Sequence, residues 1–304
     1  MSAAPGRSQA SAHRNPQGEA TPVSLMDSHP FDRAIALRHA GANLFAGECG
    51  PQYWNMVGPF GGVLAAMALN AVLRHPDLRG EPVALTVNYA AALAQGRFTI
   101  SARPARTNRS TQHWIVELVQ DGAAGASAAV LTATIMTAVR RSTWGAHDLP
   151  MPPVAQPLTR ARAKPPGPIA WLSQYEIRFL EGSVPRGLDD TENPASGEAT
   201  SLTQMWARDD PPRPLDFCSL ASMADLFFPR LFLRRRRRVP VGTVSMTTYF
   251  HTNASQLRDC GTGYVLGQAR GQVYHDGFFD HTAQLWSESG VPLATSSQIV
   301  YYKE

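Results

Sequence analysis

Asp225 is the only charged residue between Asp216 and Arg230, in a stretch that is otherwise almost entirely apolar or small. The length and flanks of this stretch predict a helix, around Leu215–Phe228, that is wrapped by protein on all sides. A carboxylate in that place loses its hydration and needs partners inside the protein. Burial also raises the pKa of a carboxyl group, which makes Asp225 a candidate general base. The structural alternative is a carboxylate that caps a loop or pairs with an arginine such as Arg230.

Two adjacent glycines, Gly61 and Gly62, open a second apolar helix that the sequence predicts from Gly61 to Leu73. At a helix start, backbone N–H groups without covering side chains are suited to a carbonyl oxygen or a phosphate. Glycine pairs also let a helix pack closely against its neighbours. Both interpretations stay open at this point.

The remaining reactive side chains exclude several common chemistries. The three cysteines have neither a disulfide pattern nor the spacing of a zinc site (Cys49, Cys218 and Cys260). No Gly-x-Ser-x-Gly motif occurs, which argues against a serine hydrolase of the α/β-hydrolase type. Four polar residues surround a glycine at an apparent hairpin tip and predict a polar turn rather than a metal site (His275, Asp276, Asp280 and His281). We expect no metal and no other cofactor.

The helices and strands that must position Asp225 and the glycine pair occur in the same order in both halves of the sequence. In the first half, the helix from Gly61 precedes four predicted strands: Val83–Leu93, Arg97–Arg103, Thr111–Gln120 and Ala128–Val139. In the second half, the helix around Asp225 precedes four more: Gly242–Thr252, Gly263–Tyr274, His281–Glu288 and Pro292–Tyr302. An antiparallel sheet curled around one central helix would bury each helix as its composition demands. This repeat predicts an α+β double hotdog.

Composition and the positions of proline-rich segments suggest the domain boundaries. The chain has 304 residues, of which 43% are hydrophobic, and a formal net charge of +4. We predict a disordered tail over residues 1–27, an N-terminal hotdog domain over 28–145, a proline-rich linker over 146–168 and a C-terminal hotdog domain over 169–304. A mitochondrial presequence is the minor alternative for the tail. Because no apolar run is long enough for a membrane span, we expect a cytoplasmic protein.

Short motifs carry a resemblance to the acyl-CoA thioesterase II family of double-hotdog enzymes. The segment Phe60-Gly61-Gly62 looks like the helix start of that family, and Thr248-Tyr249-Phe250-His251 looks like the end of one of its strands. The resemblance extends over roughly residues 30–304. It implies that Asp225, Thr243 and Gln298 together activate a water molecule, and that Phe60, Gly61 and Gly62 bind substrate. Taken singly, Thr243 and Gln298 are ordinary strand residues.

The duplication predicts that only the second half holds a working site. We expect Thr86 to correspond to Thr243 and Thr134 to Gln298. The first helix has Ala68 and Asn70 where Asp225 would map, so it lacks the carboxylate.

These observations lead to an acyl-CoA thioesterase that hydrolyses an acyl-CoA thioester. The alternative is a non-catalytic protein that binds acyl thioesters, and a hydratase is disfavoured because neither helix has a histidine–carboxylate pair. The run Arg234–Arg238 predicts a solvated connector, with phosphates of coenzyme A as the second interpretation and a nucleic acid or membrane surface as the third. Its arginines alternate with no aromatic residue, so we expect no nucleic-acid partner. The resemblance also implies a homodimer or homotetramer.

Overall fold

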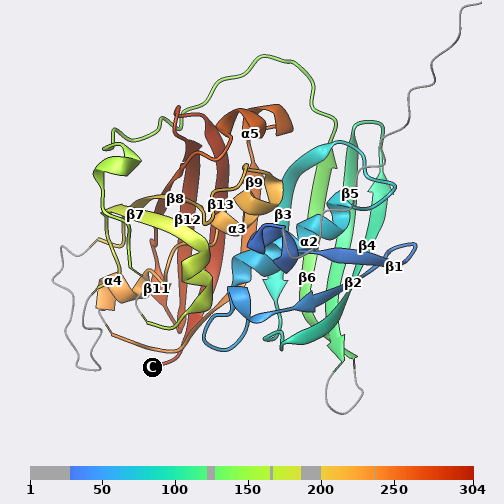
Figure 1. Ribbon diagram of the computed structural model, residues 1–304, viewed down its shortest axis with the longest axis horizontal. Coiled ribbons are helices and arrows are strands. Elements are labelled where there is room, and N and C mark those ends of the chain that lie inside the picture. The colour runs from blue at the N-terminus through green and yellow to red at the C-terminus, as the bar shows by residue number, and fades with distance from the viewer. Residues whose placement is uncertain (1–27, 122–126, 165–166, 186–199, 236) are drawn as a thin grey trace, which may run out of the picture.

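The computed structural model describes residues 28–121, 127–164, 167–185, 200–235 and 237–304. The predicted N-terminal tail therefore lies outside the described residues, as do most of the loop between residues 181 and 200 and Arg236. Figure 1 shows two half-molecules side by side, with the helices α2 and α3 near the centre, in front of one large sheet.

The described part of the first half consists of a short helix, six strands, one 3-10 turn and one long helix: α1 (Pro30–Ala34), β1 (Leu37–Gly41), β2 (Leu44–Cys49), η2 (Pro51–Tyr53), α2 (Gly61–Leu73), β3 (Glu81–Tyr89), β4 (Gly96–Thr107), β5 (Thr111–Asp121) and β6 (Ser127–Ala138). A segment with the short turn η3 (Pro157–Thr159) leads to the second half. That half consists of η4 (Ala170–Gln174), β7 (Tyr175–Glu181), β8 (Thr203–Asp209), α3 (Phe217–Met223), α4 (Leu231–Arg235), β9 (Val241–Phe250), α5 (Ala254–Cys260), β10 (Val265–Arg270), β11 (Tyr274–His275), β12 (Phe278–Ser287) and β13 (Pro292–Tyr302).

The thirteen strands of the described residues belong to one antiparallel sheet that crosses from one half into the other. The order is β1-β2-β4-β5-β6-β3-β9-β13-β12-β10-β8-β7, with β11 paired to β12. The two halves join where β3 pairs with β9, with Leu85 opposite Thr248 and Thr86 opposite Thr247. The hydroxyl oxygens of Thr86 and Thr247 lie 3.0 Å apart across this seam. The eight predicted strands are present, although β10 is shorter than expected and β1, β2 and α5 were not predicted.

Helix α2 is buried on nearly every side, as its uniformly apolar sequence predicts. It contacts β1 and β3–β6, and most of its residues from Gly62 to Val72 are buried. Its one amide side chain, Asn70, has a partner because Nδ2 donates to the carbonyl oxygen of Ile35 at 2.7 Å. The helix therefore needs no further polar partner in the core.

Helix α3 is shorter than predicted. It begins after Asp216, whose carboxylate accepts from the backbone N–H of Ser219 at 2.8 Å, and it ends at Met223 instead of continuing to Phe228. Pro229 explains part of the difference, since it cannot donate the hydrogen bond that would continue the helix and it disfavours helical geometry at Phe228. Asp225 therefore lies in a turn beyond the helix and not within it.

The predicted proline-rich linker lies against the second half of the sheet. The indole Nε1 of Trp206 donates to the carbonyl oxygen of Ala155 at 2.8 Å, and that of Trp286 donates to Leu149 at 3.1 Å. Leu149 and Met151 pack on the same two tryptophans. Because buried indole N–H groups need acceptors, the segment completes the outer face of β8 and β12.

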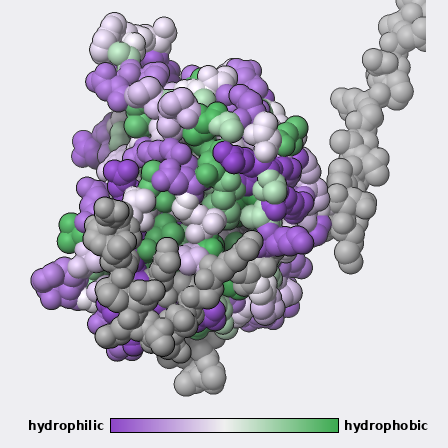
Figure 2. Space-filling model, turned by 90° about the vertical axis from the view of Figure 1, so that its left-hand side faces the viewer, coloured by the Kyte–Doolittle hydropathy of each residue, from purple (hydrophilic) through white to green (hydrophobic). Residues whose placement is uncertain are grey.

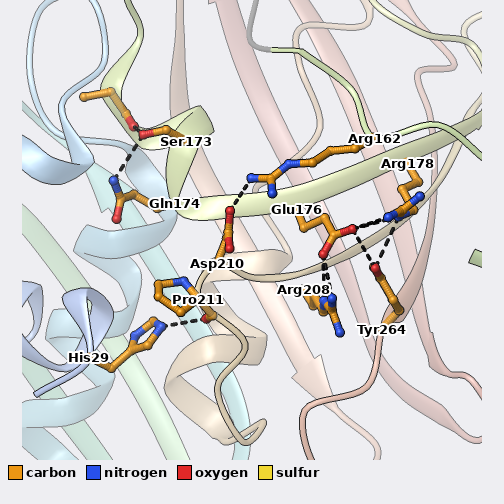
Figure 3. Close-up of polar contacts among 11 residues, drawn as sticks. His29, Arg162, Ser173, Gln174, Glu176, Arg178, Arg208, Asp210, Pro211 and Tyr264 are labelled. Carbon is orange, nitrogen blue, oxygen red and sulfur yellow. Dashed lines mark hydrogen bonds and ion pairs between the residues drawn. The ribbon is translucent and has the colours of Figure 1, made fainter. Parts of the chain in front are cut away.

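Strand β7 ends the sheet, and a cluster of charges holds it to β8. Both oxygens of Glu176 accept from guanidinium groups, at 2.5 Å from Arg178 and 2.7 Å from Arg208, and Tyr264 adds a hydroxyl at 2.7 Å (Figure 3). Burial opposes ionisation of Glu176, but the hydrogen bonds from Tyr264, Arg208 and Arg178 outweigh it and lower the pKa to about 2. Figure 2 faces this side of the molecule, where hydrophilic residues surround a band of hydrophobic ones.

Among the described residues, no helix has the length and apolar character needed to span a membrane. The described part of the chain also brings together no group of three or more His, Cys, Asp or Glu side chains that could hold a metal ion.

Candidate active site

The carboxylate of Asp225 lies at the first turn of α2, so the lone charge of the apolar stretch and the glycine pair meet in space. A Cβ atom added to Gly61 would come within 2.7 Å of Asp225 Oδ2. Real Cβ atoms do not approach an oxygen so closely, so only glycine lets the carboxylate reach this position. The base candidate comes from the second half and the helix start from the first.

Gly62 allows close packing, one of the two interpretations considered for it, whereas substrate binding by Gly61 and Gly62 stays a prediction. A Cβ atom at Gly62 would lie 2.4 Å from the carbonyl oxygen of Ser222, so the missing side chain allows α2 to contact the end of α3. Its backbone N–H also donates to Asp225 and favours the charged carboxylate. The helix dipole adds to this effect, because the N-terminal end of a helix stabilises negative charge.

Gln298 and Thr243 complete a hydrogen-bonded chain that ends on Asp225. Gln298 Nε2 donates to Asp225 Oδ1 at 2.9 Å. The hydroxyl of Thr243 donates to Gln298 Oε1 at 3.3 Å, which fixes the orientation of the amide. The structure thus brings together the three residues that the resemblance indicated.

The environment of Asp225 suits a base near neutral pH. Burial raises its pKa to about 7, and the hydrogen bonds from Gln298 and Gly62 oppose this rise. Asp225 as a whole residue is partly buried. A base whose pKa lies near the operating pH combines a useful ionised fraction with affinity for a proton.

The structural alternative of a pair with Arg230 is wrong. Arg230 is fully buried, and it donates to the carbonyl oxygens of Phe228 and Ser201 and to the hydroxyl of Thr203. Burial lowers its pKa to about 9. Arg230 therefore fastens the chain that follows the turn, while Asp225 is held by Gln298 and Gly62.

The sequence of both halves matches one enzyme family. Residues 50–138 match the acyl-CoA thioesterase N-terminal domain, and residues 148–302 match the acyl-CoA thioesterase C-terminal domain. The chain belongs to the acyl-CoA thioesterase family. Among curated proteins, none gives a significant match.

Solved structures place this thioesterase-family chain among double-hotdog proteins, which confirms the predicted fold class. A conserved protein of unknown function with a hot dog fold, from Alicyclobacillus acidocaldarius, has 41% identity and a TM-score of 0.83, over 91% of this chain and 99% of that one. The acyl-CoA thioesterase II TesB2 of Mycobacterium marinum has 18% identity and a TM-score of 0.68, over 90% and 98% of the two chains. The dehydratase domain of RzxB from Pseudomonas fluorescens has 10% identity and a TM-score of 0.56, over 91% and 99%. The last two likenesses show the fold alone.

Phe60 is placed differently from a typical substrate contact. In this thioesterase-family chain its ring is 3% exposed and stacks on Trp171, with 4.2 Å between ring centroids and 8° between planes. The ring thus fixes the start of α2 by packing. Substrate binding by Phe60 stays a prediction.

The predicted counterparts in the first half do not fit the register. Thr134 is opposite Thr86 and is exposed on the outer face of the sheet, whereas Gln298 is only 4% exposed and points inward. Successive side chains of a strand point to opposite faces of the sheet, so the outward-facing Thr134 cannot be the counterpart of the inward-facing Gln298. The row that contains Gln298 and Met246 continues across the seam to Val87 and then to Ala133. Ala133 therefore occupies the position in the first half that matches Gln298.

Sequence reasoning missed two residues of the site region. His281 was assigned to a polar turn, but it lies in β12 directly opposite Gln298 and is 1% exposed. Its Nε2 has no hydrogen-bond partner among the described residues. Tyr89, at the end of β3, lies beside Asp225, and its charge interaction with Asp225 is one cause of its raised pKa. The alternation of inward-facing and outward-facing residues along β12 could have indicated that His281 is buried. No sequence motif marks Tyr89.

The arginine run is partly structured rather than a simple loop. Arg234 and Arg235 form the last turn of α4, where positive charge is favourable, and Arg235 pairs with Glu304. Arg238 is exposed. A role in binding phosphate stays a prediction.

Proposed function

We propose that this protein is an acyl-CoA thioesterase in which Asp225 is the general base for a water molecule. The observation that carries the proposal is the chain from Thr243 through Gln298 to Asp225, which ends at the glycine-lined start of α2. Membership of the acyl-CoA thioesterase family supports an acyl-CoA substrate.

The residues can be assigned to the steps of hydrolysis. The water oxygen bonds to the thioester carbonyl carbon while Asp225 removes one proton from the water. The carbon–sulfur bond of the tetrahedral intermediate then breaks, its electron pair leaves with sulfur, and Asp225 returns the proton to the thiolate. The products are a carboxylic acid and free coenzyme A. The positive end of α2 stabilises negative charge that develops on the carbonyl oxygen.

Gln298 and Thr243 act through Asp225 in this scheme. Gln298 holds Asp225 Oδ1 by its amide N–H and leaves Oδ2 facing Gly61. Thr243 prevents the amide from turning its oxygen toward the carboxylate, because its hydroxyl donates to Gln298 Oε1. The two residues therefore keep the base in one rotamer.

The test is release of free thiol from a panel of acyl-CoA thioesters of short to long chain. Asp225→Asn should lower kcat by about 10²- to 10⁴-fold, since an amide cannot accept the proton. The matched control is Asp209→Asn, which neutralises another buried carboxyl group of the second half, one whose pKa burial raises to about 6. This control should keep most of its activity. Wild-type protein that binds acyl-CoA without releasing thiol would refute hydrolysis and favour the binding function.

A further inference from the structure

The amide hydrogen bonds of Gln298 are used within the protein, which leaves the orientation of the water to other groups. Gln298 Nε2 contacts Asp225 Oδ1 at 2.9 Å and the sulfur of Met246 at 3.5 Å. Its oxygen accepts from Thr243. An amide nitrogen has only two N–H groups, so Gln298 has no further donor for a water molecule.

The hydroxyl of Tyr89 faces the same space as the second oxygen of Asp225. Both atoms lie near the point where a Cβ of Gly61 would stand, Asp225 Oδ2 at 2.7 Å and Tyr89 Oη at 3.5 Å. The two oxygens are therefore at most 6.2 Å apart. A water molecule that accepts or donates hydrogen bonds of about 2.8 Å can bridge oxygens up to roughly 5.6 Å apart. A side chain at Gly61 would come close to both oxygens, so glycine is what lets them lie at the same helix start.

The proton of Tyr89 is directed away from this space. Its hydroxyl donates to the carbonyl oxygen of Gly61 at 3.0 Å. Burial, and then the negative charge of Asp225, raise the pKa of Tyr89 well above its usual value, so the proton stays in place. The lone pairs of Oη remain available as acceptors. A water molecule with one proton toward Asp225 and the other toward Tyr89 would present its own lone pair to a carbonyl carbon.

We propose that Tyr89 is a further catalytic residue, whose hydroxyl oxygen and Asp225 Oδ2 together hold the attacking water. This inference rests on the proposed thioesterase function. It makes the site a joint product of the two halves, since Tyr89 belongs to β3 and Asp225 to the turn after α3. The proton balance is unchanged, because Tyr89 accepts a hydrogen bond and only Asp225 takes a proton.

The test is Tyr89→Phe, which removes the oxygen and keeps the ring. We expect kcat for the best acyl-CoA of the panel to fall about 10- to 100-fold, with KM within about twofold, because positioning of the water is lost while substrate binding is kept. Tm should fall by no more than about 3 °C, from loss of the hydrogen bond to Gly61. The control is Tyr249→Phe on the neighbouring strand β9, whose side chain is 51% exposed on the outer face. It should behave as wild type.

Each other outcome overturns the inference in a distinguishable way. Unchanged kcat in Tyr89→Phe would refute a role for the hydroxyl and leave the proposed function intact. A loss of kcat together with a Tm lowered by more than about 3 °C and a raised KM would mean that the hydroxyl acts only by holding the helix start through its bond to Gly61. Wild-type protein without turnover would refute the proposed function itself, and with it an attacking water.

Discussion

The two half-molecules differ most in the helix that each half of the sheet surrounds. In the first half α2 runs for 13 residues and its interior row of strand side chains is apolar, with Val87 and Ala133. In the second half α3 has 7 residues, and the same row contains Gln298 and His281. The shorter helix frees the chain to turn, so that Asp225 can leave the axis of its own helix and reach the start of α2. The first half thus has a long helix and an apolar core, whereas the second half has a shorter helix and polar side chains in the core.

The largest effect should come from making the second half resemble the first. Gln298→Leu replaces the amide by an apolar group and removes the donor to Asp225 Oδ1. We expect kcat to fall about 100-fold or more, because the base loses its orientation and its pKa rises further. Thiol release across pH 5–9 would measure both effects. Gln284→Leu on β12 is the control, since its amide oxygen accepts from Gln268 on the next strand and, within the described residues, has no bond to Asp225. A Gln298→Leu variant with wild-type kcat would contradict a role in activity for the hydrogen bonds from Thr243 through Gln298 to Asp225.

The contact between the two helices can be broken directly. In Gly62→Ala the new methyl group would lie 2.4 Å from the carbonyl oxygen of Ser222, so backbone must shift. We expect the free energy of unfolding to fall by about 2–3 kcal/mol and Tm by roughly 5 °C. Gly145→Ala is the matched control, because nothing lies within 4 Å of its Cβ position. Equal Tm values for the two variants would show that the helices do not pack as described.

The buried carboxyl group of Asp225 should lower the free energy of unfolding as the pH rises through a defined range. Its folded pKa of about 7 lies above the ordinary value of 3.8 for an aspartate, so the folded state binds more protons than the unfolded state between these values. Stability of the wild type therefore falls as pH rises from about 4 to about 7 and is level above that range. Asp225→Asn should match the wild type at pH 4 and be more stable by about 2 kcal/mol at pH 8. Urea unfolding at both values measures this, and a difference that shrinks with rising pH would have the wrong sign.

The same titration predicts the activity profile. Turnover should rise as pH passes through about 7, because only ionised Asp225 accepts a proton from water.

The smallest expected effects on kcat come from two threonine substitutions, one next to Gln298 and one on the outer face of the sheet. Thr243→Val removes the hydroxyl that orients Gln298, and we expect kcat to fall about 10-fold. Thr134→Val alters an exposed residue of β6 in the first half and should leave kcat unchanged. Equal kcat losses in the two variants would revive the correspondence between Thr134 and the site.

Much of the fold could be predicted because it depends on local patterns. Strands β5 and β13 follow the alternation of their side chains, and α2 follows its unbroken apolar run. Strand β1 was missed because only Leu37 of its five residues is buried, which leaves no alternation to detect. The end of α3 depends on Pro229 and on the buried contacts of Arg230, which the apolar pattern alone does not reveal.

The candidate site was predictable only in part. Asp225 stands out as a charge in an apolar stretch, whereas Thr243 and Gln298 were indicated by resemblance. Tyr89 could not be found, since its place beside Asp225 depends on how β3, α2 and the turn after α3 meet. The contact between Tyr89 and Asp225 joins residues more than 130 positions apart, and no local pattern specifies it.

The segment that joins the halves across Trp206 and Trp286 also has an evolutionary consequence. In a dimer of identical chains every substitution appears twice, so a carboxylate gained in one subunit is imposed on the other. Once both halves are encoded in a single chain, each position can drift on its own. A glycine pair can then persist at one helix while its counterpart acquires an acid, and a symmetric ancestor with two equal sites can become a protein with one specialised site.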